Sequence, residues 1–334
     1  DKNELAPGPP FNATQVAECM RNPHETRPDE AYLTFLTGNQ EGYVAGVLTL
    51  QHSLRKAGCT RPLVVMHISD VPEPELEFLR SAGVALKLVP SLPNPNCKGS
   101  KGRPCQRGRD NYSKLAAFNM TEYQTLIYLD SDTLVRAAID ELFCHTSFAG
   151  SRIFTCPPGD TSCTKLNSGI MVIKPNRELY NDMMGKYMRT PSWNNGDQGF
   201  LTYYYNVAGA PHREYVDNRV YNVKVKIRDK KPCDEEMRRA LGSEQVSTKA
   251  KVMHFMDATK PWNYFLGQPD MAIVMEPSAM DNEANKRFQG ATECFVHGLQ
   301  MWKRHFLGAL QSNKGLKAYL EKRHSQNGRR GWAV

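Results

Sequence analysis

Beyond residues 1–30, which are rich in proline, asparagine and charge, short apolar runs alternate with longer amphipathic stretches. The apolar runs are short enough for buried strands, whereas the amphipathic stretches carry apolar positions at helical spacing. We expect strands at residues 31–37, 62–68 and 84–89 and helices at residues 42–56 and 74–82. This alternation predicts an α/β fold with a parallel sheet and right-handed crossovers.

The rest of the chain continues the same pattern. We expect helices at residues 111–120, 178–189, 198–206 and 284–323, and strands at residues 126–129, 166–175 and 252–256. Residues 207–250 are irregular and charged, which predicts a long functional insertion. We therefore divide the chain into a surface extension at residues 1–30, an α/β domain at 31–270 and a C-terminal helical extension at 271–334.

The strand at residues 126–129 ends abruptly in two carboxylates, Asp130 and Asp132. Open α/β sheets bind ligands at the carboxyl ends of their strands, so both side chains would lie where a ligand binds. Two hard oxygen donors suit Mg²⁺ or Mn²⁺, and such an ion in turn binds the phosphates of a nucleotide. The alternative is a strand end followed by a polar turn, because an Asp-x-Asp sequence by itself is common.

Further motifs follow in a definite order. They are LNSGIMVIKP at residues 166–175, NNGDQGFL at 194–201, and VMHF at 252–255 followed by KPWNY. Together with DSDTLV, which begins at Asp130, and NYSKLAAFNMTEY upstream of it, they resemble the glycogenin-like retaining glycosyltransferases, glycosyltransferase family eight. The resemblance covers about residues 31–266. It is closer to the plant-type branch, which transfers glucuronic acid to xylan or inositol phosphorylceramide, than to glycogenin itself.

This resemblance implies a GT-A type nucleotide-sugar-binding fold, with a Rossmann-like, mostly parallel central sheet flanked by helices, as the catalytic domain at residues 31–270. It implies a metal-dependent retaining transferase that moves a hexosyl or hexuronosyl unit from a UDP-sugar, such as UDP-glucose or UDP-glucuronate. The acceptor would be a separate glycan, glycolipid or protein, and residues 207–250 would face it. Two alternatives stay open, a self-glycosylating primer of the glycogenin type and a nucleotide-sugar-binding protein without turnover.

The resemblance also assigns roles to residues. His254 would join Asp130 and Asp132 as the third protein ligand of the metal, and its imidazole suits Mn²⁺ better than Mg²⁺. Three residues would act on the reacting groups: Lys260 on the leaving diphosphate, and Asp197 and Gln198 on the donor sugar near its anomeric carbon. The other implied donor contacts are Leu36, Thr37, Asn39 and Tyr43 at the nucleoside, and Lys114, Ser131, Asn167 and Ser168 nearer the sugar and diphosphate.

Some of these assignments have alternatives. His254 taken alone would fit a hydrogen-bonded core histidine, and Tyr43 fits core packing of its helix as well as contact with the base. Retention of the anomeric configuration is compatible with Asp197 or Gln198 as the reacting protein group. It is equally compatible with a same-face path in which the departing phosphate acts as the base.

Composition narrows the class of protein. The 334 residues are 40 % hydrophobic and 23 % charged, as in an ordinary globular protein, and no apolar run approaches the roughly 18–20 residues that span a bilayer. The formal net charge of +8 comes without a nucleic-acid-binding motif. We interpret it as favouring an anionic donor and an anionic acceptor or membrane surface, and so peripheral membrane association. For a uronate donor, Lys165 and the basic loop at residues 98–109 are candidate partners of the sugar carboxylate. The motifs leave the oligomeric state open.

The nine cysteines are many for a cytosolic enzyme, and no Cys-x-x-Cys pair indicates a zinc ribbon. Cys97 and Cys105, like Cys156 and Cys163, bracket turn-forming residues and are candidates for short disulfide loops. Cys19 is a candidate to tie the N-terminal extension to the domain. An odd cysteine must remain free or pair with another chain.

The sequons and the cysteines point to the same compartment. Of three Asn-x-Ser/Thr sequons, Asn12 lies in the N-terminal extension and is the predicted glycan site, whereas Asn111 and Asn119 flank a predicted active-site helix and are not. The chain begins at Asp1 rather than Met, which we interpret as processing or trimming. We therefore favour the secretory pathway lumen, specifically the Golgi. The alternative is a cytoplasmic protein with inert buried thiols.

Overall fold

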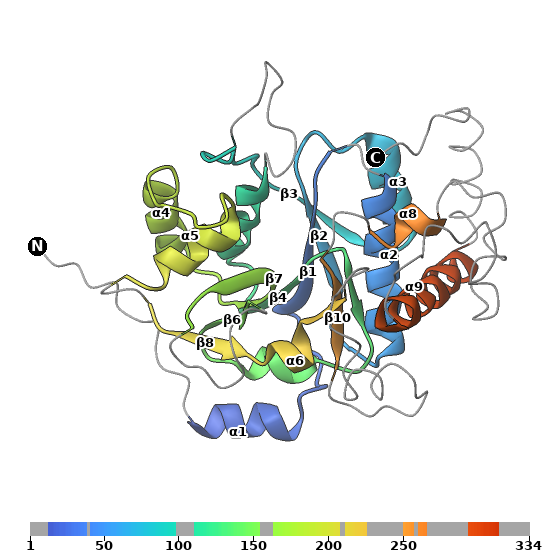
Figure 1. Ribbon diagram of the computed structural model, residues 1–334. Helices are drawn as coiled ribbons and strands as arrows, with labels where there is room; N and C mark the ends of the chain where they lie inside the picture. Colours follow the sequence, from blue (N-terminus) through green and yellow to red (C-terminus); the bar gives the residue numbers. More distant parts are fainter. Residues whose placement is uncertain are drawn as a thin grey trace, which may run out of the picture.

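The computed structural model describes residues 13–38, 41–97, 110–153, 163–207, 211–225, 250–256, 260–265 and 293–313. A seven-stranded sheet runs through the centre of the molecule, with helices on both faces (Figure 1). Its strands, in spatial order, are β3 (Ala85–Leu88), β2 (Leu63–His67), β1 (Glu30–Leu36), β4 (Thr125–Leu129), β7 (Leu166–Ile173), β6 (Phe148–Arg152) and β8 (Arg213–Val216).

The half of the sheet that comes first along the chain is parallel, as predicted. Strand β1 pairs in parallel with β2 and β4, and β2 pairs in parallel with β3. The other half is mixed, because β7 is antiparallel to both β4 and β6 while β8 is parallel to β6. An antiparallel strand, β7, therefore lies beside the strand that leads into Asp130.

Both faces of the sheet are covered, and the strand sequences show why. Along β4, Ile127 and Leu129 pack into the core under α2 (Glu41–Lys56) and α3 (Glu73–Ser81), while Leu126 and Tyr128 pack into the opposite core. That second core lies under the 3₁₀ helix η1 (Asn111–Asn119), α4 (Arg177–Lys186) and α5 (Asp197–Tyr204). Strands buried on both faces are continuous apolar runs.

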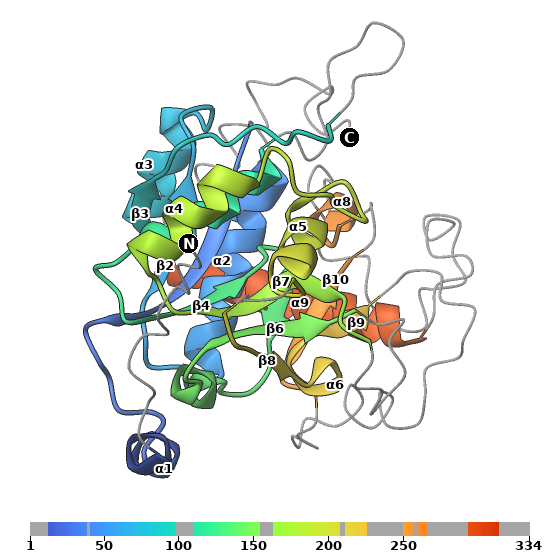
Figure 2. The same ribbon diagram turned by 90° about the vertical axis from the view of Figure 1, so that its left-hand side faces the viewer.

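A second, three-stranded sheet forms beside α2 and brings distant segments to the end of β4. Its strands are β5 (Thr133–Val135), β10 (Val252–Phe255) and β9 (Val223–Val225), with β10 in the middle. Strand β10 is antiparallel to β5, with His254 opposite Thr133, and parallel to β9. Helix α9 (Glu293–Ser312) packs on the outer side of α2 (Figures 1 and 2).

The N-terminal segment is tied to the domain as expected for Cys19. Helix α1 (Ala13–Arg21) carries Cys19, which forms a disulfide with Cys144 of the 3₁₀ helix η2 (Asp140–Cys144). Beneath this contact, Arg61 and Glu30 form a buried ion pair at 2.7 Å.

The sequence pattern missed some elements. Strand β5 and helix η2 are too short to show a period, and β6 has no apolar run. Residues 111–119 form a 3₁₀ rather than an α-helix. The expected irregular stretch at 207–250 is wrong for residues 213–225, which form β8, α6 (Asn218–Tyr221) and β9. The described part of the expected helix at residues 284–323 forms α9 (Glu293–Ser312), in which Trp302 and Phe306 are buried. Leu316 and Leu320 lie outside the described residues.

Candidate active site

The two carboxylates lie in a tight connection between β4 and β5. Asp130 N–H donates to Gly169 O on β7 at 2.9 Å, and the Thr133 N–H and hydroxyl both donate back to Asp130 O. Asp132 O accepts a hydrogen bond from Phe255 N–H of β10 at 3.0 Å. Because both sheets hold this connection, the carboxylates project where the two sheets meet.

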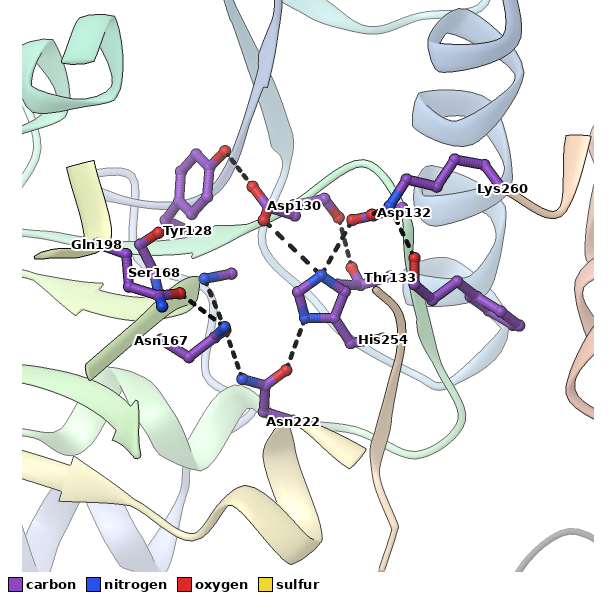
Figure 3. Close-up of polar contacts among 12 residues, drawn as sticks. Tyr128, Asp130, Asp132, Thr133, Asn167, Ser168, Gln198, Asn222, His254 and Lys260 are labelled. Carbon is purple, nitrogen blue, oxygen red and sulfur yellow. Dashed lines mark hydrogen bonds and ion pairs between the residues drawn. The ribbon is translucent and has the colours of Figure 1, made fainter. Parts of the chain in front are cut away.

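His254 enters this place from β10. Its Nε2 lies 3.2 Å from Asp132 Oδ1 and 3.8 Å from Asp130 Oδ2, and ligand atoms of the three residues all fall within 4.8 Å of one another (Figure 3). A Cβ on Gly169 would meet His254 Cε1 at 2.3 Å, so only glycine leaves room for the ring. Two carboxylates and one imidazole are a donor set that fits Mn²⁺, and Mg²⁺ less well.

Two lysines lie against the same carboxylates. Lys114 Nζ donates to Asp130 Oδ1 at 2.8 Å, and Lys260 Nζ donates to Asp132 Oδ2 at 2.5 Å and to Phe255 O at 2.9 Å. Burial alone would lower the pKa of Lys114, but the charges of Asp130 and Asp197 raise it well above its usual value. Lys114 therefore stands beside the cluster as a fixed positive charge.

Asp197 and Gln198 open α5 on the far side of Lys114. Asp197 is buried, and its Oδ2 has no hydrogen-bond partner although Lys114 Nζ is 3.7 Å away. Gln198 Oε1 accepts from Asn167 Nδ2 at 2.8 Å and from Ser168 N–H at 3.3 Å. A buried carboxylate oxygen without a partner is the kind of atom that a ligand hydroxyl satisfies.

The turn before α5 holds the first residues of this helix in place through hydrogen bonds to Gly196 and Gly199. Gly199 N–H donates to Asn194 Oδ1 at 2.8 Å, and Gly196 N–H donates to Ser192 Oγ at 2.9 Å. A Cβ on Gly199 would lie 2.2 Å from Ser192 Oγ. The glycine after Gln198 is thus required by the fold of the turn itself.

Two of the predicted nucleoside contacts, Leu36 and Thr37, lie at the end of β1, and a third, Tyr43, lies in α2. Leu36 is buried, and Thr37 is hydrogen-bonded to Asp70, which also accepts from Gly38 N–H. Tyr43 packs against Trp262, with ring centroids 4.8 Å apart.

Two glycines of α2 allow the approach of Trp262. A Cβ on Gly42 would lie 2.2 Å from the indole of Trp262, and one on Gly46 would lie 2.6 Å from the carbonyl oxygen of the buried Ser131. The structure thus gives Tyr43 a packing partner. Asn39 and the whole basic loop at 98–109 lie outside the described residues.

Two residues of the site, Tyr128 and Asn222, were not predicted from the sequence, and one predicted residue, Lys165, has its described contact with Trp193. Tyr128 donates its hydroxyl to Asp130 Oδ1 at 2.7 Å, and buried Asn222 lies 2.8 Å from His254 Nδ1. The two-residue spacing of Tyr128 and Asp130 on one strand was a usable signal; nothing in the spacing pointed to Asn222. The candidate uronate partner Lys165 is exposed, with its Nζ 5.2 Å from the ring centre of Trp193.

The sheet order and the carboxylate–histidine cluster at its edge define a GT-A type nucleotide-sugar-binding fold. The apo structure of the bifunctional glycosyltransferase WbbM shares this fold, with a TM-score of 0.51, 11 % identity and coverage of 89 % of this chain and 52 % of that one. No family model matches the chain.

Sequence relatives identify the family. Galactinol synthase 7 of Arabidopsis thaliana is 30 % identical over 283 residues, which are 75 % of this chain and 80 % of the relative. Glycogenin-1 of Oryctolagus cuniculus is 30 % identical over 241 residues, 71 % of this chain and 66 % of that protein. The chain belongs to the glycogenin-like glycosyltransferases of family eight.

A plant glucuronosyltransferase matches a shorter region at higher identity. Inositol phosphorylceramide glucuronosyltransferase 1 of Arabidopsis thaliana is 35 % identical over 175 residues, 52 % of this chain. Those residues span only 30 % of that protein. The predicted leaning toward the plant branch of the family is confirmed.

Proposed function

We propose that this chain is a divalent-cation-dependent, retaining glycosyltransferase that moves a hexosyl or hexuronosyl unit from a UDP-sugar to a separate glycan, glycolipid or protein. The observation that carries the proposal is the cluster of Asp130, Asp132 and His254. It lies on one side of Lys114, and the unpartnered carboxylate oxygen of Asp197 lies on the other. Diphosphate and sugar of one donor would occupy these two neighbouring places.

Asp130, Asp132 and His254 would hold Mn²⁺ or Mg²⁺, and such an ion neutralises a diphosphate as a Lewis acid and orients it. Lys260, now on Asp132, can reach the leaving diphosphate with the same ammonium group. Lys114 stands between the carboxylates of Asp130 and Asp197.

Asp197 and Gln198 would bind the donor sugar. The Asp197 carboxylate can accept a sugar hydroxyl, and Gln198 has its oxygen committed to Asn167 and Ser168, so its NH₂ is the group left to donate. Asn167 and Ser168 thereby support Gln198. Retention with Asp197 as nucleophile predicts a trappable glycosyl–enzyme adduct, whereas a same-face path predicts none.

The names of the relatives suggest which UDP-sugars to test as donors. The relatives are named glucuronosyltransferase, galactinol synthase and glycogenin. The higher identity to the first favours UDP-glucuronate over UDP-glucose or UDP-galactose. The net charge of +8 agrees with an anionic donor and with peripheral membrane association.

The compartment proposed is the Golgi lumen. Cys19 and Cys144 form a disulfide with each other. Cys97 and Cys163 each take part in a disulfide as well. Disulfides persist in oxidising compartments. Among the described residues, no helix is long and apolar enough to cross a membrane. Asn12, the proposed glycan site, lies outside the described residues.

The test is UDP release from a panel of UDP-sugars, with and without Mn²⁺ and candidate acceptors. The proposal expects activity with at least one donor, loss of that activity in EDTA, and better recovery with Mn²⁺ than with Ca²⁺. Full activity in chelator refutes the metal role. Intact-mass spectrometry after incubation separates transfer to an acceptor from self-glycosylation, which adds sugar mass to the protein. Donor binding without any UDP release would favour a non-catalytic sugar-nucleotide-binding protein.

A further inference from the structure

Asn222 follows α6 and is fully buried behind the metal-site histidine. Its Oδ1 lies 2.8 Å from His254 Nδ1, and its Nδ2 lies 2.8 Å from Asn167 Oδ1. Asn167 Nδ2 lies 2.8 Å from Gln198 Oε1. Figure 3 shows the result, a continuous chain of side-chain hydrogen bonds from His254 to Gln198.

Two backbone amides fix the direction of this chain. Gly169 N–H donates to Asn167 Oδ1 at 3.0 Å, and Ser168 N–H donates to Gln198 Oε1 at 3.3 Å. A backbone N–H can only donate, so the side-chain atoms that face these amides must be oxygens. The Asn222 group that faces Asn167 Oδ1 must then be its NH₂, and the Asn222 oxygen must face His254.

An oxygen opposite Nδ1 requires a proton on that nitrogen. When the imidazole is neutral it carries one proton, so Nε2 keeps its lone pair. This Nε2 is the atom directed at Asp132 and Asp130, and only a nitrogen with its lone pair can bind a cation. The backbone amides of Ser168 and Gly169 therefore set the protonation pattern of His254 through the intervening side-chain amides.

We infer that Asn222 is a positioning residue: it holds His254 with its proton on Nδ1 and aims Nε2 at the divalent cation, and through Asn167 it couples that ring to the donor-sugar amide of Gln198. This inference rests on the metal-dependent transfer proposed above. The ring lies close against the backbone of β7, since a Cβ on Gly169 would come within 2.3 Å of its Cε1. Outer partners of metal-bound histidines commonly fix the tautomer in this way.

Two substitutions separate the two hydrogen bonds of Asn222. Asn222→Leu keeps the volume and removes both, whereas Asn222→Asp keeps an oxygen opposite Nδ1 and removes the NH₂ that reaches Asn167. With UDP present, Mn²⁺ titrated by electron paramagnetic resonance should bind about 10–100-fold more weakly to Asn222→Leu and within about threefold of wild type to Asn222→Asp. Asn218→Ala is the matched control, since Asn218 lies on α6 but donates to the backbone of Arg152; its Mn²⁺ affinity should equal that of wild type.

A second readout needs no substitution at Asn222 and no turnover. In wild-type protein with ¹⁵N-labelled histidine, Nδ1 of His254 should carry a proton both without a cation and with Mg²⁺ and UDP. The signal is identified by its loss in His254→Gln. An unprotonated Nδ1 overturns the inference, whether or not the Asn222 variants fold.

The binding data have equally definite outcomes. Unchanged Mn²⁺ affinity in Asn222→Leu overturns the inference, and equal losses in the Leu and Asp variants also overturn it, because they indicate packing alone. If wild type binds no divalent cation, the proposed function fails instead. In that case the ¹⁵N measurement still tests whether His254 carries its proton on Nδ1, as the hydrogen-bond chain requires.

Discussion

Asp130 and Asp132 are two residues apart, yet they face different partners. The Asp130 side chain is 25 % exposed and meets Lys114 and Tyr128, whereas Asp132 is buried between His254 and Lys260. Burial alone would raise the pKa of Asp132, but the close approach of His254 and Lys260 holds it well below its usual value. This carboxylate therefore stays ionised at neutral pH, as a cation ligand must.

We expect Asp130→Asn and Asp132→Asn each to lower metal-dependent donor turnover more than tenfold, about 1.4 kcal/mol in activation free energy. Each change keeps the volume and removes one charged ligand. UDP release under saturating Mn²⁺ measures the effect. Asp182→Asn is the control, because Asp182 is also 25 % exposed and paired with a lysine, Lys186, at 2.7 Å. More than a tenth of wild-type turnover in either site variant contradicts the metal role.

Lys260→Ala should lower turnover more than it weakens UDP binding. Charge on the leaving diphosphate grows toward the transition state, so an ammonium group beside it stabilises that state more than the bound donor. Turnover and UDP affinity, the latter by calorimetry, are compared with those of Lys251→Ala, whose lysine pairs with Glu141 instead. Equal losses in turnover and UDP affinity would show that Lys260 binds the diphosphate uniformly.

Gly169→Ala should weaken Mn²⁺ binding at least about tenfold, because the new methyl group displaces the ring of His254. Its Cβ would lie 2.3 Å from His254 Cε1 and 2.9 Å from Asn167 Oδ1. The matched control is Gly185→Ala in α4, where a Cβ has nothing within 4 Å and helix propensity favours alanine. An Mn²⁺ affinity equal to that of wild type would mean that β7 shifts to make room.

At the scale of elements, the packing of α9 on α2 depends on a pair of histidines. His52 Nδ1 and His305 Nδ1 lie 3.2 Å apart, and a Cβ on Gly308 would lie 2.5 Å from the His52 ring. Burial, the charge of His52, and the nearby Arg304 and Lys56 lower the pKa of His305 to about 4. Burial, Lys56 and Arg55 also lower the pKa of His52.

This contact should make stability depend on pH. Because the folded pKa of His305 lies below its ordinary value of 6.5, the unfolded chain binds more protons between pH 6.5 and pH 4. The stabilisation is complete above pH 6.5 and is lost as the pH falls, by on the order of 1–2 kcal/mol after allowance for partial exposure.

Urea unfolding at several pH values from 7 to 5 tests this expectation. In His305→Gln the free energy of unfolding should fall less over that range than in wild type. His212→Gln, a change at an exposed histidine, should follow the wild-type curve. Parallel curves for wild type and His305→Gln would show that His305 has the same pKa in the folded and the unfolded chain, which contradicts the expectation.

At the scale of the whole molecule, disulfides join segments that the sheet leaves apart. The Cys19–Cys144 bridge has a sequence separation of 125 and fastens α1 under the domain. Cys97 and Cys163 are bonded too, while their predicted partners Cys105 and Cys156 lie outside the described residues. Cys59 is free, and burial raises the pKa of its thiol to about 11, which makes it unreactive.

The variant Cys19→Ser/Cys144→Ser should lose up to about 5 kcal/mol of unfolding free energy, because closing so long a loop restricts the unfolded chain. Cys59→Ser is the control for replacing a thiol. Peptide mapping without reductant should recover the Cys19–Cys144 bridge and the predicted Cys97–Cys105 and Cys156–Cys163 bridges. Nine alkylatable thiols in native-source protein would instead indicate a reduced compartment.

The sequence by itself determined the parallel half of the sheet and most of the candidate site residues. Apolar runs such as residues 126–129 can be satisfied only by burial on both faces, and this makes β4 predictable from its own composition. The ordered motifs around Asp130, Asn167, Asp197 and His254 indicated the family before any contact was known. These signals are local, because each depends on residues close together in the chain.

Only the tertiary structure decided how these pieces meet. Strand β10 lies between β5 and β9, which sets His254 against Asp132, and neither short partner strand has a period that the sequence could show. Asn222 lies on a stretch that the pattern left irregular, and its role depends on two hydrogen bonds to distant residues. Such contacts follow from the packing of whole elements, so no local pattern of hydrophobic and polar residues encodes them.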